Sequence, residues 1–501
     1  MIDARPFPPG DYGVVVVGTG PGGLQTAYCL ARLGIDHALI SADEAPGGMF
    51  VRLPIFERLI SWTKPDAPVE RTTREYERYD HNSMLAEDDA AKALVPRFMD
   101  RTYDVPSRAE MYSGLQAFAE LAGVQARYGC AWQATRRADD GRLVLETADG
   151  EYRCHAAVFA IGVTEPWKPP VPGLDAAPHY VETRAASDYR GRRVAVIGKR
   201  NSGFEVANGL LPWAGEVVML SPRPVLTASL ALSPIRTRYL QPYDEYARGV
   251  GGAFVLDAAI ERVDRTESGF RVVAHGTTRP GPLAVDVDDV VVATGFRTPL
   301  LDLPDLGVAT VSGGRIAAQT PYFESVSAPG VYFAGNATGG ATGLLKVEQA
   351  GNSTSVGGFR YNARLVAERI AERHFGRERP QPSLRTDDIV PLLLAQLTRA
   401  PELWVQRGYL ARVVTFGHDV GARDEGIVPL TDFVDSAGPD AVAAAVELGA
   451  DATIAPILYL RRAGAVSEHQ LEPHPFHRYE NDEYSRELGH VLAQFLRVPA
   501  A

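Results

Sequence analysis

The stretch Val14-Val-Val-Val-Gly18-Thr-Gly20-Pro-Gly-Gly23 decides the fold of this chain. Its four consecutive valines predict a strand that is buried on both faces, as in a parallel sheet. The glycines fit a dinucleotide-binding turn: Gly18 permits the turn, Gly20 lets backbone approach a pyrophosphate, and Gly23 lets a helix pack near the strand. Residues 24–33 are expected to form that helix, with its positive N-terminal end facing the anion.

The composition is that of an ordinary globular protein. The 501 residues suit about three domains, and a hydrophobic fraction of 45% allows a sizeable core. The net charge of −11, without a basic block, argues against nucleic acid or an anionic membrane as a partner. The first ten residues do not resemble a signal peptide, and no run of about 18 apolar residues predicts a membrane span.

Three cysteines stand far apart, at Cys29, Cys130 and Cys154, and no Cys-x-x-Cys occurs. This pattern excludes a redox dithiol of the thioredoxin-reductase kind. Sparse, unpaired cysteines also predict the reduced cytoplasm as the location.

The second strand of the first unit is predicted at residues 37–40 and ends at Ser41. A carboxylate about 20 residues past the glycines usually holds a ribose hydroxyl, and here Ser41 takes that position, with Asp43 and Glu44 just beyond. A serine hydroxyl can still bond the ribose, although more weakly than a charged acceptor. Gly47, Gly48 and Met49 mark a second place where backbone passes close to a neighbour.

Residues 51–105 show no clear period, and we interpret them as an insertion with short helices over the cofactor. Arg52, His81 and Asn82 are the polar candidates for a reactive pocket within it. The alternative is that they are ordinary solvated loop residues, because most polar residues are exposed.

Ser107 and Glu110 have the spacing of a capping box, which predicts a helix over residues 111–121. Short alternating runs over 125–160 then predict a strand-rich return to the sheet, with Trp132 as a candidate neighbour of an adenine.

The opening pattern returns after a strand ending at Ala160-Ile-Gly162 and a proline-rich linker. Residues Arg193-Val-Ala-Val-Ile-Gly198-Lys-Arg-Asn-Ser-Gly203 predict a second strand and turn, followed by a helix over 204–211 and a strand over 217–220. Gly198 to Ser221 spans twenty-three positions, as Gly18 to Ser41 does. Two such units in one chain are a far more specific signal than either alone.

The second unit carries arginines where the first carries glycine or acid. Arg200 replaces the middle glycine, and Arg223 lies two residues past Ser221. An arginine at the end of this strand can accommodate the 2′-phosphate of NADP, which favours NADPH over NADH. The alternative is an ordinary exposed arginine at position 223.

A strand over 289–293, followed by Thr294 and Gly295, mirrors the strand before Gly162. The chain is then expected to return to the first domain at Gly335-Asn336, and Gly339 to Gly343 to lead into a long helix that is interrupted near Gly357 and Gly358.

These motifs resemble the flavoproteins with two dinucleotide-binding domains, and most closely the class B flavin monooxygenases; the resemblance covers residues 12–375. His179, nineteen residues before Gly198, matches that family's fingerprint histidine. The resemblance implies FAD in the first unit, NADPH in the second, and oxygen transfer from a flavin C4a-hydroperoxide to a small molecule. It also lets the N-terminus of the helix after Gly343 face the isoalloxazine.

The expected fold is therefore α/β, with two Rossmann-like domains and a C-terminal α+β extension. We expect an FAD-binding domain over 1–165 and 320–375, an NADPH-binding domain over 190–298, and an extra domain over 383–501. The residues expected to contact the two cofactors are Gly18, Gly20, Gly23, Ser41, Gly47, Gly48, Met49, Trp132, Ala160, Gly162, Gly198, Arg200, Asn201, Ser202, Gly203, Ser221, Arg223, Thr294, Gly295, Gly335 and Asn336.

The region 383–501 lies outside the resemblance. Helices are predicted at 388–398, 439–448 and 483–496, and strands at 409–416 and 453–460. The region could cover the substrate site or join two subunits as a homodimer. Its cluster His469, Glu472, His474 and His477 fits no standard zinc spacing, so no metal is expected.

Three functions remain open from the sequence. The leading hypothesis is a monooxygenase that uses FAD, NADPH and dioxygen on a small molecule, by N- or S-oxygenation or a Baeyer–Villiger reaction. The second is an NADPH-dependent flavin reductase for a disulfide, quinone or protein acceptor. The third is a non-catalytic nucleotide sensor, which the departures at Ser41, Arg200 and Asn336 would favour.

Overall fold

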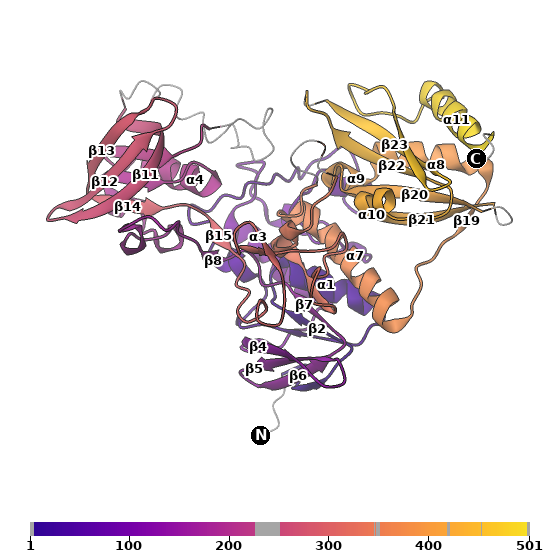
Figure 1. The fold of residues 1–501 in the computed structure, drawn as a ribbon, viewed down its shortest axis with the longest axis horizontal. Coiled ribbons are helices and arrows are strands. Elements are labelled where there is room, and N and C mark those ends of the chain that lie inside the picture. The colour runs from indigo at the N-terminus through magenta and orange to yellow at the C-terminus, as the bar shows by residue number, and fades with distance from the viewer. Residues whose placement is uncertain are drawn as a thin grey trace. The chain divides into compact units, whose positions relative to one another are not determined.

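The computed structural model describes residues 5–225, 251–344, 346, 351–417, 421–451 and 453–497 (Figure 1). The chain forms two compact units, one of Met1–Val51, Ser61–Val163 and Thr298–Ala501, and one of Arg52–Ile60 and Thr164–Arg297. The breaks after Val163 and Arg297 lie close to the predicted boundaries at 165 and 298. Two features were not predicted: residues 52–60 belong to the second unit, and the C-terminal region joins the first.

The first unit is built on a parallel sheet in the order β18 (Val331–Phe333), β7 (Ala156–Phe159), β2 (Val14–Val17) and β3 (His37–Ile40). All four valines of β2 are buried, as the sequence predicts. Helix α1 (Pro21–Arg32) follows β2 and packs against α7 (Val356–Phe375). The predicted strand–turn–helix is therefore confirmed, with α1 beginning three residues early, at a proline that suits a first helical position.

A second sheet of this unit has the order β1 (Gly10–Asp11), β6 (Gly150–Cys154), β5 (Leu143–Thr147) and β4 (Trp132–Arg137). Its apolar side chains share one core with those of β2, β3 and β7. This confirms the predicted strand-rich return. A short hairpin, β16 (Thr310–Val311) and β17 (Ile316–Ala317), follows later in the chain.

The insertion consists of short helices, as predicted: η1 (Gly48–Val51), η2 (Arg74–Arg78), η3 (Asp89–Ala91) and α2 (Val95–Phe98). The capping box of Ser107 and Glu110 is present and opens α3 (Arg108–Leu121). Gln25 of α1 is fully buried and exchanges two hydrogen bonds with the backbone of Leu85, which fixes the insertion to α1.

The second unit repeats the strand–turn–helix. Strands β11 (Ala253–Thr266), β10 (Glu216–Ser221), β9 (Arg193–Ile197) and β14 (Asp289–Val292) are parallel, in that order. Helix α4 (Asn201–Leu210) follows β9, while β12 (Gly269–Gly276) and β13 (Gly281–Val287) extend the sheet in antiparallel fashion. The described part of this unit also contains three short helices, η4 (Leu174–Ala176), η5 (Tyr180–Glu182) and η6 (Ala186–Tyr189), and the pair β8 (Glu165–Pro166) and β15 (Phe296–Arg297).

The segment 52–60 is anchored within the second unit by specific contacts. The backbone N–H of Ile55 donates to Tyr180 Oη at 3.0 Å, and that of Phe56 donates to Glu205 Oε1 at 2.9 Å. The ring of Phe56 lies so close to α4 that a Cβ on Gly209 would meet it at 2.5 Å. Only glycine at position 209 leaves room for this ring.

The C-terminal region carries an antiparallel sheet in the order β19 (Ser383–Leu384), β21 (Gly421–Pro429), β20 (Leu410–Gly417), β22 (Ala441–Leu448), β23 (Ile454–Arg462) and β24 (Ala465–Gln470). Helices α8 (Thr386–Arg399), α9 (Pro401–Val405), α10 (Leu430–Asp435) and α11 (Asp482–Arg497) accompany it. The prediction of an α+β extension is confirmed.

One expected helix is wrong, and another differs from the prediction in its start and its continuity. Residues 441–448 form the central strand β22, whose first six residues are all buried; a continuous apolar run has no period that separates strand from helix. The helix expected to follow Gly343 begins only at Val356, and it runs unbroken through Gly357 and Gly358. These glycines serve close packing, since a Cβ on Gly358 would lie 2.0 Å from Asn352 O.

Among the described residues, no helix combines the length and apolarity that crossing a bilayer would require.

Candidate functional site

The glycine turn of the first unit has a geometry that only glycine permits. Gly18 has φ +104°, and a Cβ there would lie 2.6 Å from Ala160 O. A Cβ on Gly23 would lie 1.8 Å from Gly18 O. The turn between β2 and α1 is therefore held tightly against the end of β7, as the motif requires.

Three separate loops, those of Ala160, Gly48 and Gly335, meet at this turn. A Cβ on Gly48 would lie 2.7 Å from Gly20 Cα, and a Cβ on Gly22 would lie 2.3 Å from Gly335 Cα. By contrast, a Cβ on Gly20 would meet no atom nearer than Gly48 Cα at 3.8 Å, so space remains beside this residue. Gly20 is the N-cap of α1, whose N-terminus has no side-chain cap and no acidic residue in its first turn. An anion fits this N-terminus.

A hydroxyl and carboxylate chain lies at the end of β3, where a ribose is expected. Thr19 Oγ1 donates to Ser41 Oγ at 2.9 Å, and Ser41 Oγ donates to Asp43 Oδ2 at 3.2 Å. The backbone N–H of Asp43 returns a bond to Ser41 Oγ at 3.1 Å. The strand end itself has no carboxylate, and Asp43, two residues later, brings one into contact with Ser41; sequence reasoning noted Asp43 without giving it a role.

The loop after β7 is tied to the loop after β18. Gly162 has φ +73°, and the next backbone N–H, that of Val163, donates to Asn336 Oδ1 at 3.0 Å. Gly335 and Asn336 begin the short helix η7 (Gly335–Gly340). The predicted residues Ala160, Gly162, Gly335 and Asn336 therefore come together around the glycine turn.

The second unit has the same turn geometry. Gly198 has φ +129°, and a Cβ there would lie 2.3 Å from Ala293 O. A Cβ on Gly203 would lie 2.3 Å from Gly198 O. Arg200 is the N-cap of α4 in extended conformation, and Asn201 and Ser202 form the first turn of that helix. The duplication seen in the sequence is therefore a duplication of backbone geometry.

The strand end of the second unit differs in charge. Lys199 is buried and forms an ion pair with Asp257, whose other oxygen accepts from Thr278 Oγ1 at 2.6 Å. Burial opposes ionisation, but the bonds from Lys199 and Thr278 hold the pKa of Asp257 below its usual value. Asp257 pairs with Ser221 across β10 and β11, and Arg223 is exposed just beyond. Sequence reasoning missed Lys199.

Thr294 and Gly295 contact the linker within the second unit. Thr294 Oγ1 donates to Trp167 O at 2.6 Å, while Gly295 O accepts from Trp167 N at 3.0 Å. Gly295 O also lies 3.0 Å from His179 Nε2. Burial lowers the pKa of His179, so the neutral ring is favoured at this position. The fingerprint histidine thus has a structural contact here.

The three candidate catalytic residues are not gathered in one unit. Arg52 is exposed and belongs to the second unit. In the first unit, the His81 ring lies beside Trp62, with centroids 4.4 Å apart. Asn82 is fully buried and donates to Ser61 O and Thr63 Oγ1 at 3.0 and 2.9 Å, so the alternative of a solvated loop residue is wrong for Asn82.

Two other predicted neighbours of the cofactors have different surroundings. Trp132 lies in the core against Phe159, and its indole N–H donates to Thr135 Oγ1 at 2.8 Å. These contacts account for Trp132 as a core residue. Met49 lies in η1 beside the half-buried Gly48.

All three cysteines are buried and unpaired. Burial raises the pKa of the Cys29 thiol to about 11 and that of Cys154 to about 12. Neither thiol would be ionised at neutral pH, and a thiolate is the reactive form. No dithiol relay is available in this chain.

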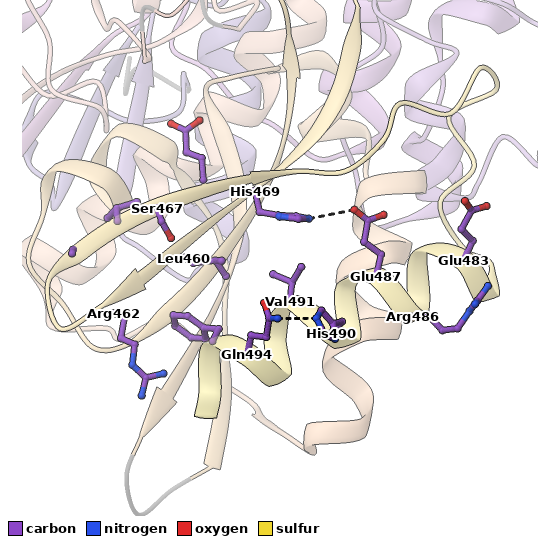
Figure 2. Close-up of a pocket in the computed structure, with 14 residues that line it drawn as sticks. Leu460, Arg462, Ser467, His469, Glu483, Arg486, Glu487, His490, Val491 and Gln494 are labelled. Atoms are coloured by element: carbon purple, nitrogen blue, oxygen red, sulfur yellow. Dashed lines mark hydrogen bonds and ion pairs between the residues drawn. The ribbon is translucent and has the colours of Figure 1, made fainter. Parts of the chain in front are cut away.

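The histidines of the C-terminal region point to different partners. His469 Nε2 lies 3.3 Å from Glu487 Oε1, His474 Nδ1 accepts from Phe476 N, and the His477 ring packs on Trp404. A groove of about 960 Å³ lies between β24 and α11, with His469, Glu487 and His490 along it (Figure 2). Within the described ranges, no group of side chains has the arrangement of a metal site.

The family described as pyridine nucleotide-disulphide oxidoreductase matches residues 15–335, which contain both glycine turns. FAD-dependent oxidoreductase domain-containing protein 2 of Danio rerio is 28% identical over 219 residues, which cover 42% of this chain and only 31% of that relative. A ferredoxin–NADP reductase of Ralstonia pickettii is 23% identical over 64% of this chain and 79% of its own length.

Solved structures share the fold. A flavin-containing monooxygenase from Stenotrophomonas maltophilia aligns over 72% of this chain and 98% of its own, with a TM-score of 0.54 at 20% identity.

Proposed function

This chain belongs to the pyridine nucleotide-disulphide oxidoreductase family, and we propose that it is a monooxygenase of a small molecule. The chain is a flavin-dependent oxidoreductase that uses FAD and NADPH, as its family and its two nucleotide-binding turns indicate.

The residues of the first turn fit FAD. Gly18 and Gly23 allow the tight turn, Gly20 leaves room for a pyrophosphate at the N-terminus of α1, and the Ser41 and Asp43 pair presents acceptors for a ribose hydroxyl. When bound, FAD would accept hydride from NADPH and pass electrons to dioxygen. The chain's own part is to hold the ring system and to keep water away from it.

The absence of a usable dithiol is the observation that carries the proposal. Members that reduce disulfides through their own cysteines need two adjacent thiols, one of them ionised. Here Cys29, Cys130 and Cys154 are buried and unpaired. In this proposal electrons leave the flavin directly, and dioxygen is their acceptor. The likeness to a flavin-containing monooxygenase supports the same choice.

Stopped-flow reoxidation tests the proposal. Protein reduced by NADPH is mixed with air-saturated buffer that contains NADP⁺, and the visible spectrum is followed. We expect a transient species distinct from both the reduced and the oxidised protein. Direct return to the oxidised spectrum, with hydrogen peroxide released in step with NADPH consumption, would contradict monooxygenation.

The second candidate is an NADPH-dependent flavin reductase with an external acceptor. The similarity to ferredoxin–NADP reductase over 64% of this chain favours it. Rapid, NADPH-driven reduction of a quinone, disulfide or ferredoxin, with no transient during reoxidation, would support this reading. A non-catalytic sensor would be eliminated if the purified protein is yellow and bleaches with NADPH.

We expect Arg223→Ala to weaken NADPH binding about tenfold and to leave NADH binding unchanged. The guanidinium would contact the 2′-phosphate, which NADH lacks, and a charged hydrogen bond is worth about 1.5–3 kcal/mol. Dissociation constants for both nucleotides check this. Arg262→Ala, an exposed arginine on β11, is the matched control and should change neither constant. Equal loss for NADPH and NADH would remove the phosphate role from Arg223.

A further inference from the structure

A buried polar chain starts in the C-terminal region at Gln406, which follows α9 and is fully buried. Its Nε2 donates to Asn362 Oδ1 at 2.5 Å and lies 3.3 Å from Ser353 Oγ. Its Oε1 accepts the backbone N–H of Asn352. Every polar atom of this side chain therefore has a partner, which a buried amide requires.

This chain of hydrogen bonds continues through α7 into η7. Asn362 is fully buried, and its Nδ2 donates to Thr338 Oγ1 at 3.1 Å. The Thr338 hydroxyl lies 2.7 Å from Gly335 O and 2.9 Å from Ser353 O. Its single proton serves one of these acceptors at a time. Gln406 is thus linked to Gly335 through two side chains, those of Asn362 and Thr338.

Gly335 is the far end of this chain and also one of the three loops at the flavin-binding turn. A Cβ on Gly22 would lie only 2.3 Å from the Cα of Gly335. On the other side of η7, Gln319 Nε2 donates to Ala337 O at 2.7 Å, and Asn336 Oδ1 holds Val163 N. Movement of η7 would therefore shift Gly335 relative to the glycine turn.

The side chain of Gln406 is closely packed against residues 351 and 352. A Cβ on Gly351 would lie 2.5 Å from Gln406 Oε1, and Gly351 N donates to Arg407 O at 2.7 Å. The backbone of Gly351 and Asn352 is in this way held by two consecutive residues, Gln406 and Arg407. A displacement of this segment would reach Thr338 through Ser353.

We propose that Gln406 is a positioning residue of the flavin site: through Asn362 and Thr338, its amide holds η7 against the glycine turn. The C-terminal region then contributes to FAD affinity, although it lies beyond residue 335, where the family match ends. This inference rests on the proposed function only in requiring FAD in the first unit.

The test measures the FAD dissociation constant of the full chain after removal and return of the cofactor. Gln406→Leu should raise the constant about tenfold, the loss of about 1.4 kcal/mol that one buried hydrogen-bond network can supply. It should also shift the visible flavin band. Val442→Ala removes buried apolar atoms in the same C-terminal sheet and is the matched control, with both readouts expected to stay at wild-type values.

A double-mutant cycle with Thr338→Val separates a linked chain from two independent effects. If the linked hydrogen bonds act together, Gln406→Leu raises the FAD dissociation constant little further once Thr338 has lost its hydroxyl. Fully additive effects, or an FAD constant in Gln406→Leu within twofold of wild type, would overturn the proposal. Should Gln406→Leu fail to fold, Gln406→Glu is measured instead, since it keeps the acceptor for Asn352 N and replaces the Nε2 donor to Asn362 and Ser353 by a carboxylate oxygen.

Failure of the proposed function gives a different result. If wild type binds FAD but does not oxygenate, the affinity readout still decides the role of Gln406. If wild type binds no FAD, the claim about FAD affinity fails, and hydrogen exchange of residues 335–341 decides only whether Gln406 holds η7 in place. Faster exchange there in Gln406→Leu, but not in Val442→Ala, supports the positioning role, and unchanged exchange overturns it.

Discussion

Gly20→Val should yield folded protein that is colourless. A Cβ at position 20 meets no atom closer than 3.8 Å, so the polypeptide itself tolerates the change. The added methyl groups would instead occupy the space at the N-terminus of α1 where the pyrophosphate is expected. Flavin content per polypeptide and a thermal melt check this, with flavin near zero and cooperative unfolding retained.

Two further glycines control this experiment. Gly489→Val on α11 adds a side chain where a Cβ would meet nothing within 4 Å, and flavin content should not change. Gly23→Ala should prevent correct folding, because its Cβ would lie 1.8 Å from Gly18 O. Stoichiometric flavin in Gly20→Val would show that FAD is not bound at this turn.

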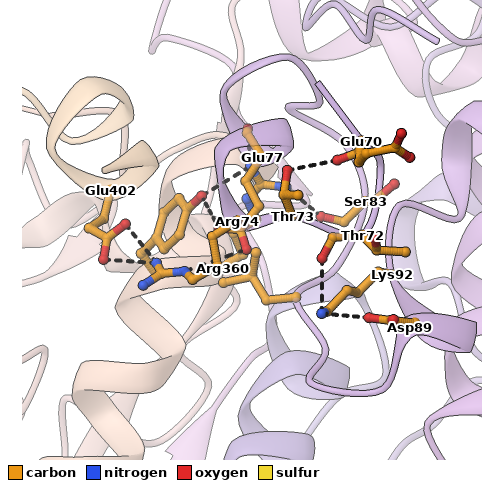
Figure 3. Close-up of polar contacts among 12 residues, drawn as sticks. Glu70, Thr72, Thr73, Arg74, Glu77, Ser83, Asp89, Lys92, Arg360 and Glu402 are labelled. Atoms are coloured by element: carbon orange, nitrogen blue, oxygen red, sulfur yellow. Dashed lines mark hydrogen bonds and ion pairs between the residues drawn. The ribbon is translucent and has the colours of Figure 1, made fainter. Parts of the chain in front are cut away.

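Arg74→Ala should destabilise the first unit by about 2 kcal/mol at pH 8, because it leaves the buried carboxylate of Glu402 without its cationic partner. Glu402 of α9 is 4% exposed, and both of its oxygens accept from Arg74 Nη2, at 2.9 and 2.7 Å (Figure 3). We expect less than the 3–5 kcal/mol typical of fully buried pairs because the Arg74 side chain is 53% exposed. Urea unfolding of both proteins measures the difference.

The pH dependence identifies the cause. Burial opposes ionisation of Glu402, but attraction and hydrogen bonds from Arg74 outweigh it and hold its pKa below the usual value. In wild type, the pair therefore stabilises the fold above about pH 4.3 and is lost as the pH falls through the lowered pKa. Without Arg74, burial should raise that pKa, so the variant regains stability on acidification as Glu402 becomes neutral.

The difference in unfolding free energy between wild type and Arg74→Ala should consequently become smaller from pH 8 to pH 5. Arg101→Ala, which removes an exposed arginine of the same insertion, should cost little at either pH. A gap that stays constant with pH would mean that lost packing, not the unpaired carboxylate, causes the destabilisation.

What could be predicted from the sequence were features fixed by neighbouring residues. The two glycine turns depend on φ values and close approaches within a few positions, so Gly18 and Gly198 identified them. The capping box of Ser107 and Glu110 is equally local and is confirmed. The valine run of β2 could be recognised because a strand inside a parallel sheet is apolar on both faces.

The errors and omissions involve partners far apart in the chain. Pro439, which suits a first helical turn, predicts a helix over residues 439–448, but β20 and β23 pair with β22 on both sides. The ion pair of Lys199 with Asp257 and the bond of Gln406 to Asn362 join positions with no shared motif. The assignment of Arg52 and His81 to different units likewise follows from where the chain leaves one unit for the other.

Residues 52–60 also determine how the nucleotide-binding half can be studied in isolation. A recombinant fragment of residues 164–297 would omit Ile55 and Phe56, and with them the partners of Tyr180, Glu205 and the glycine face of α4. Such a fragment would expose the surface of α4 at Gly209 that the Phe56 ring covers in the full chain. A version that keeps this surface covered needs residues 52–60 supplied as a fused tag or as a synthetic peptide.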